Sequence, residues 1–371
     1  MTPAIIRALA RVHSCATIPI LATVLVAGRT LTTTDTYTTL RVTLPPDAAP
    51  LPPALLDIAW FGRLAKLAGK KHAIRLTPDG ATVGGTAYRA PRLGHDVGTV
   101  ADFPAYAPAA RATFAALEPA DFRRAGAVVV ALDSASTDRA RPGLYAVHLA
   151  PIVSGTDGHR LARRTPVAAD TMEGLDVLLE RPAVQLVIAM VAAAPPVTMW
   201  ARADDRLVTV AATCADGSAW EVTSRIVQTA HPPYEEIAPA DPGTPVVVPG
   251  DFARDAAKLY GRHGGAYVAI WADGSCAARA IGTGERATSA GTMQESRAPD
   301  GLLPADPPLA IVNASYLADA LDSTTGDVTI HVAPNDGPMT VLGHLVMPMS
   351  LEKIALPACL DRRPATVPLA A

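Results

Sequence analysis

The sequence predicts an α+β fold in which helices cover one face of antiparallel sheets. Apolar residues recur at helical spacing in several stretches, as Ile5, Leu9 and Val12 do, whereas β-branched runs bounded by Gly or Pro are typical of strands. The order helix, strands, helix, strands recurs three times along 371 residues, although the three units share almost no identity. We therefore expect an internal repeat of small domains, consistent with two or three domains for this length.

The first unit is predicted to begin with a helix over Pro3–His13, where the missing N–H of the proline costs nothing. After it come strands around Thr23–Val26 and Leu31–Leu44, a proline-rich link at 45–53, a helix over Ala54–Ala68, and strands at Ile74–Leu76 and Ala81–Tyr88.

The second and third units follow the same order. In the second we predict a strand at Thr113–Leu117, helix Pro119–Leu132, strand Leu144–Ala150, helix Thr171–Leu179 and strands from Val184 to Gln228. In the third we predict helix Gly250–Tyr260, strands from Ala266 to Thr288, a loop at 297–308, helix Ala314–Leu321, and strands Val328–Val332 and Met339–Val346.

Composition excludes several classes of protein. Hydrophobic residues make up 49% of the chain and charged residues 18%, which is typical of a globular protein with a large core. The net charge of −3 means that any nucleic-acid contact must come from a local basic face. The four cysteines are far apart and form no CxxC, so neither a zinc site nor a disulfide framework is expected, and a reducing cytoplasm fits. No cofactor or metal motif is found.

The N-terminus has some features of a signal peptide. Arg7 and Arg11 precede the apolar run Ala16–Gly28. Pro19 interrupts this run and no clean A-x-A cleavage site follows, which favours a retained N-terminus. No window holds the ~18 uninterrupted apolar residues of a membrane span.

Two distant stretches stand out as a candidate binding surface. Thr156–Ala162 places an Asp-Gly turn before His159 and Arg160. Val346-Met347-Pro348-Met349 combines flexible, apolar Met side chains with a rigid proline, which suits an adaptable hydrophobic groove.

These stretches resemble signatures of the bacterial replicative sliding clamp, the beta subunit of DNA polymerase III. Further matches, in the family's order and spacing, are Thr17–Leu21, Asp102–Pro104, Arg141–Leu144, His231–Tyr234 and Val312–Leu317, so the resemblance spans about residues 3–351.

The resemblance implies three clamp domains, at 1–108, 109–239 and 240–351, with a C-terminal extension at 352–371. It further implies a closed ring of two chains, with helices facing the hole. Such a ring encircles duplex DNA without reading its sequence, carries out no catalysis, and works in the cytoplasm on the nucleoid. The implied partners are a DNA polymerase, a clamp loader and repair proteins that bind through short peptide motifs.

By matched position, thirteen residues are implied to line the peptide groove: Leu144, Thr156, Gly158, His159, Arg160, Leu161, Asn313, Tyr316, Val346, Met347, Pro348, Met349 and Leu351. The alternative is that Val346–Met349 is ordinary core and that His159 and Arg160 cap a loop, because apolar strand residues usually serve packing.

Clusters of basic residues on or beside the expected helices are candidates for phosphate contacts. They are Arg7, Arg11, Arg63, Lys66, Lys70, Lys71, Arg123, Arg124, Arg254 and Lys258. The alternative for each is an ordinary solvated helix face. Two expected helices argue against a continuous basic lining, because Thr171–Leu179 carries Glu173 and Asp176, and Ala314–Leu321 carries Asp319.

The sequence departs from the clamp pattern at several places. Ser350 follows Met349 where the family usually has Arg, and Cys15 and Ala16 occupy the place of a family Arg before Thr17–Leu21. The C-terminal extension lacks the Gln and Leu-Phe pair typical of clamp-binding peptides. These departures leave open a second function, a clamp-like adaptor or decoy that keeps the groove without encircling DNA.

One enzymatic alternative is a secreted hydrolase with Cys276 as nucleophile and His263 as base. A single Cys and a single His are far more often structural. No G-x-S-x-G nucleophile elbow is present, and Gly282-Thr283-Gly284 is not followed by the third glycine of a dinucleotide-binding loop.

Overall fold

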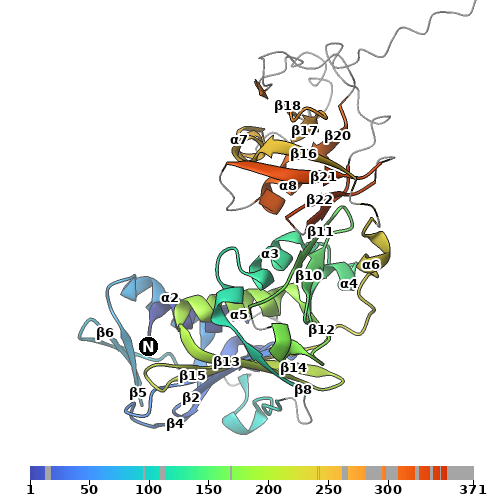
Figure 1. The fold of residues 1–371 in the computed structure, drawn as a ribbon. Helices are drawn as coiled ribbons and strands as arrows, with labels where there is room; N and C mark the ends of the chain where they lie inside the picture. Colours follow the sequence, from blue (N-terminus) through green and yellow to red (C-terminus); the bar gives the residue numbers. More distant parts are fainter. Residues whose placement is uncertain are drawn as a thin grey trace, which may run out of the picture. The chain divides into compact units, whose positions relative to one another are not determined.

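A computed structural model describes residues 1–12, 18–94, 97–108, 113–167, 169–239, 241, 243–260, 266–280, 295–297, 308–321, 326–334, 337–342, 344 to 348. The chain forms two units (Figure 1). The first consists of Met1–Ser154 and Arg164–His231, and the second of Gly155–Arg163 and Pro232–Ala371. The first unit thus contains the first predicted domain and most of the second. The predicted boundaries near 108 and 239 remain predictions, and the one at 351 lies outside the described residues.

The first unit is built on an eight-stranded antiparallel sheet with the order β4-β1-β2-β3-β15-β14-β13-β8. Its strands are β1 (Thr23–Gly28), β2 (Thr30–Thr34), β3 (Thr38–Thr43), β4 (Leu51–Asp57), β8 (Thr113–Leu117), β13 (Pro196–Ala203), β14 (Leu207–Cys214) and β15 (Ala219–Arg225). Strands β3 and β15 join the two halves, with Leu40 opposite Val222. Burial alternates along β3, as expected when only one face of a strand meets the core.

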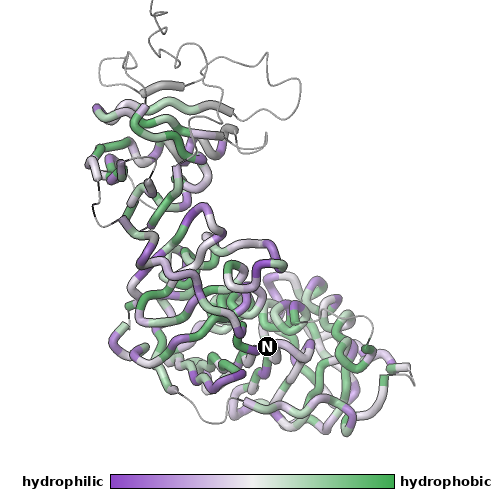
Figure 2. Tube along the Cα trace, turned by 90° about the vertical axis from the view of Figure 1, so that its right-hand side faces the viewer, coloured by the Kyte–Doolittle hydropathy of each residue, from purple (hydrophilic) through white to green (hydrophobic). Residues whose placement is uncertain are grey.

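Four helices complete the core of this unit: α1 (Pro3–Arg11), α2 (Ile58–Ala68), α3 (Ala127–Ser134) and α5 (Arg181–Ala193). Helix α1 packs against α2 and α5, and α3 also contacts α5. Ile6, Phe61 and Val187 are fully buried in the shared core. Figure 2 shows hydrophobic and hydrophilic segments alternating along the chain within each unit, as elements with one buried face require.

Smaller elements flank this sheet. Strands β5 (Ile74–Thr77), β6 (Gly80–Val83) and β7 (Thr86–Arg89) form a separate antiparallel sheet. A short helix α4 (Pro142–Tyr145) leads into β9 (Ala146–Leu149), which pairs with β10 (Val153–Thr156) and β12 (Val177–Glu180).

The second unit contains two antiparallel strand arrays and a helix pair. The first array has the order β11-β23-β22-β21-β16, with β11 (Arg160–Arg164), β16 (Thr244–Pro249), β21 (Asp327–Val332), β22 (Met339–Val341) and β23 (His344–Val346). The second array, β19-β18-β17-β20, comprises β17 (Ala266–Ile270), β18 (Cys276–Ala280), β19 (Glu295–Arg297) and β20 (Ala310–Asn313). Helices α7 (Gly250–Tyr260) and α8 (Ala314–Leu321) pack together, and α6 (Tyr234–Ile237) precedes them.

The helix predicted at Thr171–Leu179 is wrong, and the strands predicted from Val184 to Gln228 begin only at β13, after the helix α5. Gly174 has φ of +86°, and the stretch instead forms a 3-10 turn at Ala169–Met172 followed by β12. The β-branched run from Val184 suggested a strand, but it belongs to α5, whose Pro182 sits in the first helical turn. Burial of Val184 and Val187 against the core outweighs their weak helix propensity.

Other predicted elements have shifted ends. The helix expected from Ala54 begins at Ile58, because β4 pairs with β1 and the Asp57 carboxylate accepts the first-turn N–H of Trp60 at 2.8 Å. The helix expected at Pro119–Leu132 divides at Ala125, which has φ of +63°. The strand expected from Leu144 begins at Ala146, after α4. The predictions for α7 and α8 are confirmed, and the first predicted helix is found as α1 but ends at Arg11.

Candidate peptide groove and nucleic-acid face

The turn between β10 and β11 is organised by the side chain of Asp157. Its Oδ1 accepts the backbone N–H of His159 at 2.9 Å and that of Arg160 at 3.1 Å. Thr156 Oγ1 donates to the carbonyl of Arg160 at 2.6 Å and accepts the N–H of Gly158 at 3.1 Å. Gly158 has φ of +92°, which favours glycine, so local hydrogen bonds and one glycine together define the shape of this turn.

Strand pairing brings the two distant stretches together within the second unit. On β11 and β23, Arg160 lies opposite Val346 and Leu161 opposite Leu345. The ladder extends one step further, because the N–H of Met347 donates to the carbonyl of His159 at 2.9 Å. Residues almost 190 positions apart therefore lie on neighbouring strands, as the resemblance to sliding clamps implied.

Helix α8 supplies the aromatic side of this surface. The ring of Tyr316 lies 6.4 Å from that of His159 at an interplanar angle of 14°, and the guanidinium carbon of Arg160 lies 4.7 Å from its centroid. Asn313 Oδ1 accepts the N–H of Ser315 at 2.9 Å and so caps the helix start. Burial raises the pKa of Tyr316, and the nearby Asp157 carboxylate adds to the increase. The phenol is therefore neutral at physiological pH.

Arg160 is held by two carboxylates. Its Nε donates to Asp157 Oδ2 at 3.1 Å, and its Nη1 donates to Asp319 Oδ2 on α8. The Arg160 side chain is only 14% exposed, whereas that of Asp319 is 48% exposed. Our sequence reasoning did not assign Asp157 or Asp319 to the site. Asp319 could have been found, because it lies three residues after Tyr316 and so faces the same side of α8.

The predicted groove residues fall into three groups. The side chains of Thr156, Leu161 and Val346 are buried and support the surface from beneath. Asn313, Tyr316, Met347 and Pro348 are half-buried, and Gly158 and His159 are exposed. Leu144 lies on α4 of the first unit, and Met349 and Leu351 lie outside the described residues.

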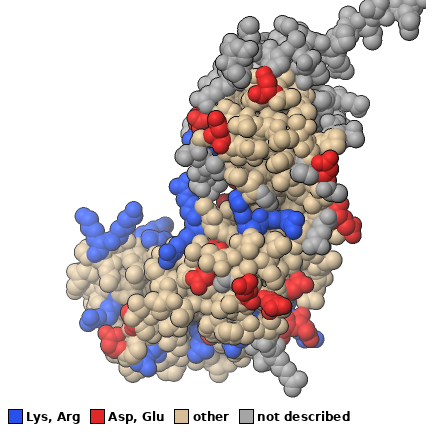
Figure 3. Space-filling view, in the orientation of Figure 1, with Lys and Arg blue, Asp and Glu red and all other residues tan. Residues whose placement is uncertain are grey.

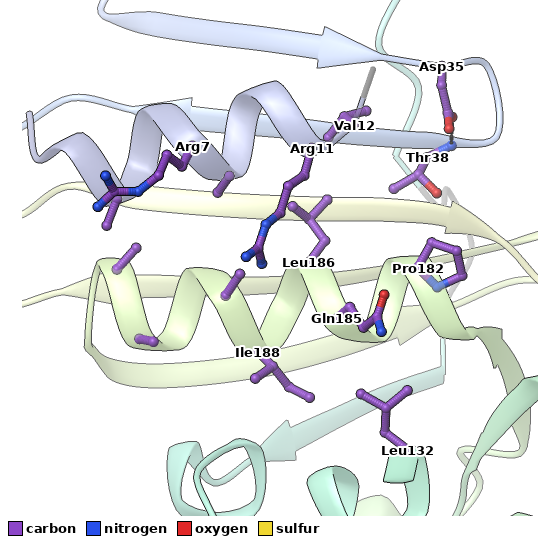
Figure 4. A pocket seen from close by; sticks show the side chains of 15 residues that line it. Arg7, Arg11, Val12, Asp35, Thr38, Leu132, Pro182, Gln185, Leu186 and Ile188 are labelled. Carbon is purple, nitrogen blue, oxygen red and sulfur yellow. Dashed lines mark hydrogen bonds between the residues drawn. The ribbon is translucent and has the colours of Figure 1, made fainter. Parts of the chain in front are cut away.

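The predicted basic residues are best grouped in the first unit. Arg63, Lys66, Lys70 and Lys71 are all exposed on or just after α2, and Figure 3 shows blue side chains gathered over this edge of the unit. Arg7 and Arg11 are exposed on α1, and the Arg11 side chain extends towards α5 (Figure 4). A cavity of about 780 Å³ lies there, floored mainly by alanine and aliphatic side chains such as Leu186 and Ile188.

The remaining basic residues are more scattered. Arg123 and Arg124 are exposed in the turn before α3. Arg254 Nε donates to the carbonyl of Gly250 at 3.2 Å, and Lys258 Nζ lies 3.7 Å from Oδ1 of Asp255. Glu173 and Asp176 do not lie on a helix, so the acidic helix expected there is wrong. The helix in that region is α5, whose Arg181 donates Nη1 to the carbonyls of Leu132 and Ala135.

The structure does not favour Cys276 as a nucleophile. Its side chain is buried, and burial raises the pKa of the thiol to about 12, so the reactive thiolate is suppressed at neutral pH. His263, its expected base, lies outside the described residues. Among the residues that the structure describes, no cluster of His, Cys, Asp or Glu could hold a metal ion. No helix in the described parts of the chain is long and apolar enough to cross a membrane.

Comparison with known proteins identifies the architecture. No family model matches the sequence, and no curated protein does. Among solved structures, the DNA polymerase III beta subunit from Thermotoga maritima matches with a TM-score of 0.70 at 18% identity, over 94% of this chain and 97% of that one. The chain has the sliding-clamp fold.

Two further structures with this fold are similar to the chain. The DNA polymerase sliding clamp from Pseudomonas aeruginosa, solved with a ligand, has a TM-score of 0.66 at 20% identity, over 94% of this chain and 98% of that one. The sliding clamp from Bartonella birtlesii, solved bound to griselimycin, has a TM-score of 0.67 at 16% identity, over 95% of this chain and 98% of that one. The sliding-clamp fold thus accounts for nearly the whole chain.

Proposed function

We propose that this protein is a DNA sliding clamp, a ring of two chains that encircles duplex DNA and tethers a polymerase and other partners through a peptide groove. The observation that carries the proposal is the joining of β11 to β23, which builds a surface from His159, Tyr316 and Met347 on a chain with the sliding-clamp fold. Neither a nucleophile nor a redox group is needed for this function.

The groove binds peptides through a soft apolar surface. The half-buried Met347 adapts its shape to different side chains, whereas the Asp157-centred turn keeps the adjoining backbone rigid. The loader that opens the ring, the polymerase and repair proteins would bind here in turn, each through a short motif. The three-domain division at 108 and 239 belongs to the same proposal.

The DNA face of the proposed ring consists of the basic helix surfaces. Exposed Arg7, Arg11, Lys66 and Lys70 would neutralise phosphates without contacting base edges. Binding of this kind is independent of sequence, as a sliding protein requires.

The proposal is tested on DNA of two topologies. The protein is loaded onto a nicked circular duplex and onto the same duplex after linearisation, and is then washed in high salt. A closed ring stays on the circle and runs off the linear form, because its retention is topological. Equal loss from both DNAs would contradict encirclement.

A second candidate function is the adaptor that keeps the groove without encircling DNA. The specific observation in its favour is α5, whose exposed positions Pro182, Gln185 and Ala192 carry no charge, and whose Arg181 is engaged by two backbone carbonyls. An adaptor would bind the groove peptide as a clamp does, but would be lost equally from circular and linear DNA.

A further inference from the structure

The segment that connects the two halves of the eight-stranded sheet passes over one face of that sheet. The sheet has β4 at one edge and β8 at the other, and the 3-10 turn Val100–Asp102 contacts β4. After this turn the chain has to reach β8 at the opposite edge. We call residues 103–108, which lie between these two points, the strap.

Tyr106, in the strap, contacts both halves of the sheet. Its hydroxyl donates to Glu221 Oε2 on β15 at 2.9 Å, and the guanidinium carbon of Arg41 on β3 lies 5.2 Å from its ring centroid. Glu221 and Arg41 are opposite each other in the pairing of β15 with β3, and Arg41 Nη1 lies 4.0 Å from Glu221 Oε2. Tyr106 therefore lies on the seam, the β3–β15 pairing that joins the two halves.

The Tyr106 hydroxyl also belongs to a chain of hydrogen bonds. It lies 3.2 Å from Thr223 Oγ1, which in turn lies 2.8 Å from Thr209 Oγ1 on β14. Because an ionised carboxylate can only accept, the donors run from Thr209 through Thr223 and Tyr106 to the carboxylate of Glu221. Both threonines are buried, although their neighbours Val208 and Val222, and not they, face the core. Burial raises the pKa of Tyr106 to about 12, so its phenol keeps the proton that it donates.

We propose that the strap locks the two halves of the sheet together, with Tyr106 as its fastening point. Buried Phe103 anchors the strap at one end, and at the other the chain enters β8, which pairs with β13. Bending of the sheet at the seam would break the hydrogen bond to the carboxylate and expose the buried threonines. The lock is a property of the first unit by itself. In the proposed ring it would leave opening to other joints, and only this consequence rests on the proposed function.

Hydrogen–deuterium exchange of the full chain, followed by mass spectrometry, tests the lock. Tyr106→Phe keeps the aromatic ring against Arg41 and removes only the hydroxyl. We expect amide exchange in Thr38–Thr43 and Ala219–Arg225 to become about tenfold faster, as for the loss of a hydrogen bond to a charged acceptor. Exchange in Pro196–Ala203, which forms β13 away from the seam, should keep the parent rate.

Two further variants separate the lock from a general effect on stability. Tyr88→Phe removes a hydroxyl from another half-buried tyrosine of the first unit and should leave exchange at the seam unchanged. Glu221→Gln keeps a neutral acceptor and should accelerate exchange at the seam by a smaller factor, because hydrogen bonds between neutral groups are weaker. Exchange at the parent rate in the seam of Tyr106→Phe would overturn the proposal. Equal acceleration in Pro196–Ala203 would overturn it too, because Tyr106 would then contribute only to overall stability.

Discussion

At the residue scale, neighbouring positions in the same motif have different tasks. Val346 is 1% exposed and belongs to the core of the second unit, together with Ile330 and Leu317. Met347, the next residue, is half-buried, and its N–H extends the pairing with β11. The last residue of β23 thus serves packing, whereas the residue that follows the strand is partly exposed at the candidate groove.

This separation gives a paired prediction. Met347→Ala should weaken binding of a Gln and Leu-Phe peptide at least about tenfold with little loss of stability, because it removes a half-buried apolar side chain at the proposed groove. Val346→Ala should lower the free energy of unfolding by about 2 kcal/mol, because it leaves a cavity in the core. Anisotropy and urea denaturation measure the two effects. If Met347→Ala binds the peptide as the parent does, the groove assignment fails.

Single residues also explain the rigidity of the turn at 156–160. The carboxylate of Asp157 accepts two backbone N–H groups and an Arg160 N–H at once. Hydrogen bonds to a charged acceptor are about twice as strong as neutral ones. The candidate groove thus joins a hydrogen-bonded polar turn to methionine and aromatic side chains.

At the element scale, the helices differ in the charge that they expose. Helix α2 buries Phe61 and Leu64 and exposes Arg63 and Lys66 between them. This amphipathic arrangement places cations at a fixed distance from the core. Helix α5 buries a similar apolar face but exposes Gln185 and Ala192 instead. The basic surface is therefore uneven from helix to helix.

Charge reversal on and just after α2 tests the role of this basic surface. Lys66→Glu together with Lys70→Glu should reduce retention on DNA, and the slope of log K against log salt should become shallower by about 1.8, or about 0.9 per lost phosphate contact. The matched control is Arg29→Glu together with Arg206→Glu, which changes the net charge equally at exposed turn positions of the first unit. An equal loss of DNA retention in both double variants would indicate an effect of net charge rather than DNA binding by this helix surface.

At the scale of the whole molecule, the sliding-clamp fold makes oligomeric state the central question. One chain covers 97% of a Thermotoga maritima beta subunit, so this chain is as long as a clamp protomer. Encirclement by the proposed ring requires a second chain.

The prediction at this scale concerns mass. Light scattering should give about twice the 38.4 kDa of one chain, and this value should hold through serial dilution. A mass near that of one chain at every concentration would favour the adaptor over the clamp. A mass that falls on dilution would indicate that the two chains dissociate readily. The protein concentration at the midpoint of that fall would give the dimer Kd.

Local sequence patterns determined part of this architecture. Helices α1, α7 and α8 were predictable because their apolar residues have helical spacing, and α1 also has a proline near its start. The turn at 156–160 was predictable because Asp157-Gly158 has a strong local preference. No local pattern links Thr156–Leu161 to Val346–Met347. Their proximity was expected only because both stretches resemble motifs of the sliding-clamp family.

Tertiary structure alone decided the rest. The run from Val184 is β-branched and favours a strand locally, but it forms a helix because it packs against α1 and the sheet of the first unit. The ion pair between Arg160 and Asp319 joins residues 159 positions apart, and no local spacing could predict it. Propensities act between near neighbours, whereas burial and charge pairing depend on which distant segments meet.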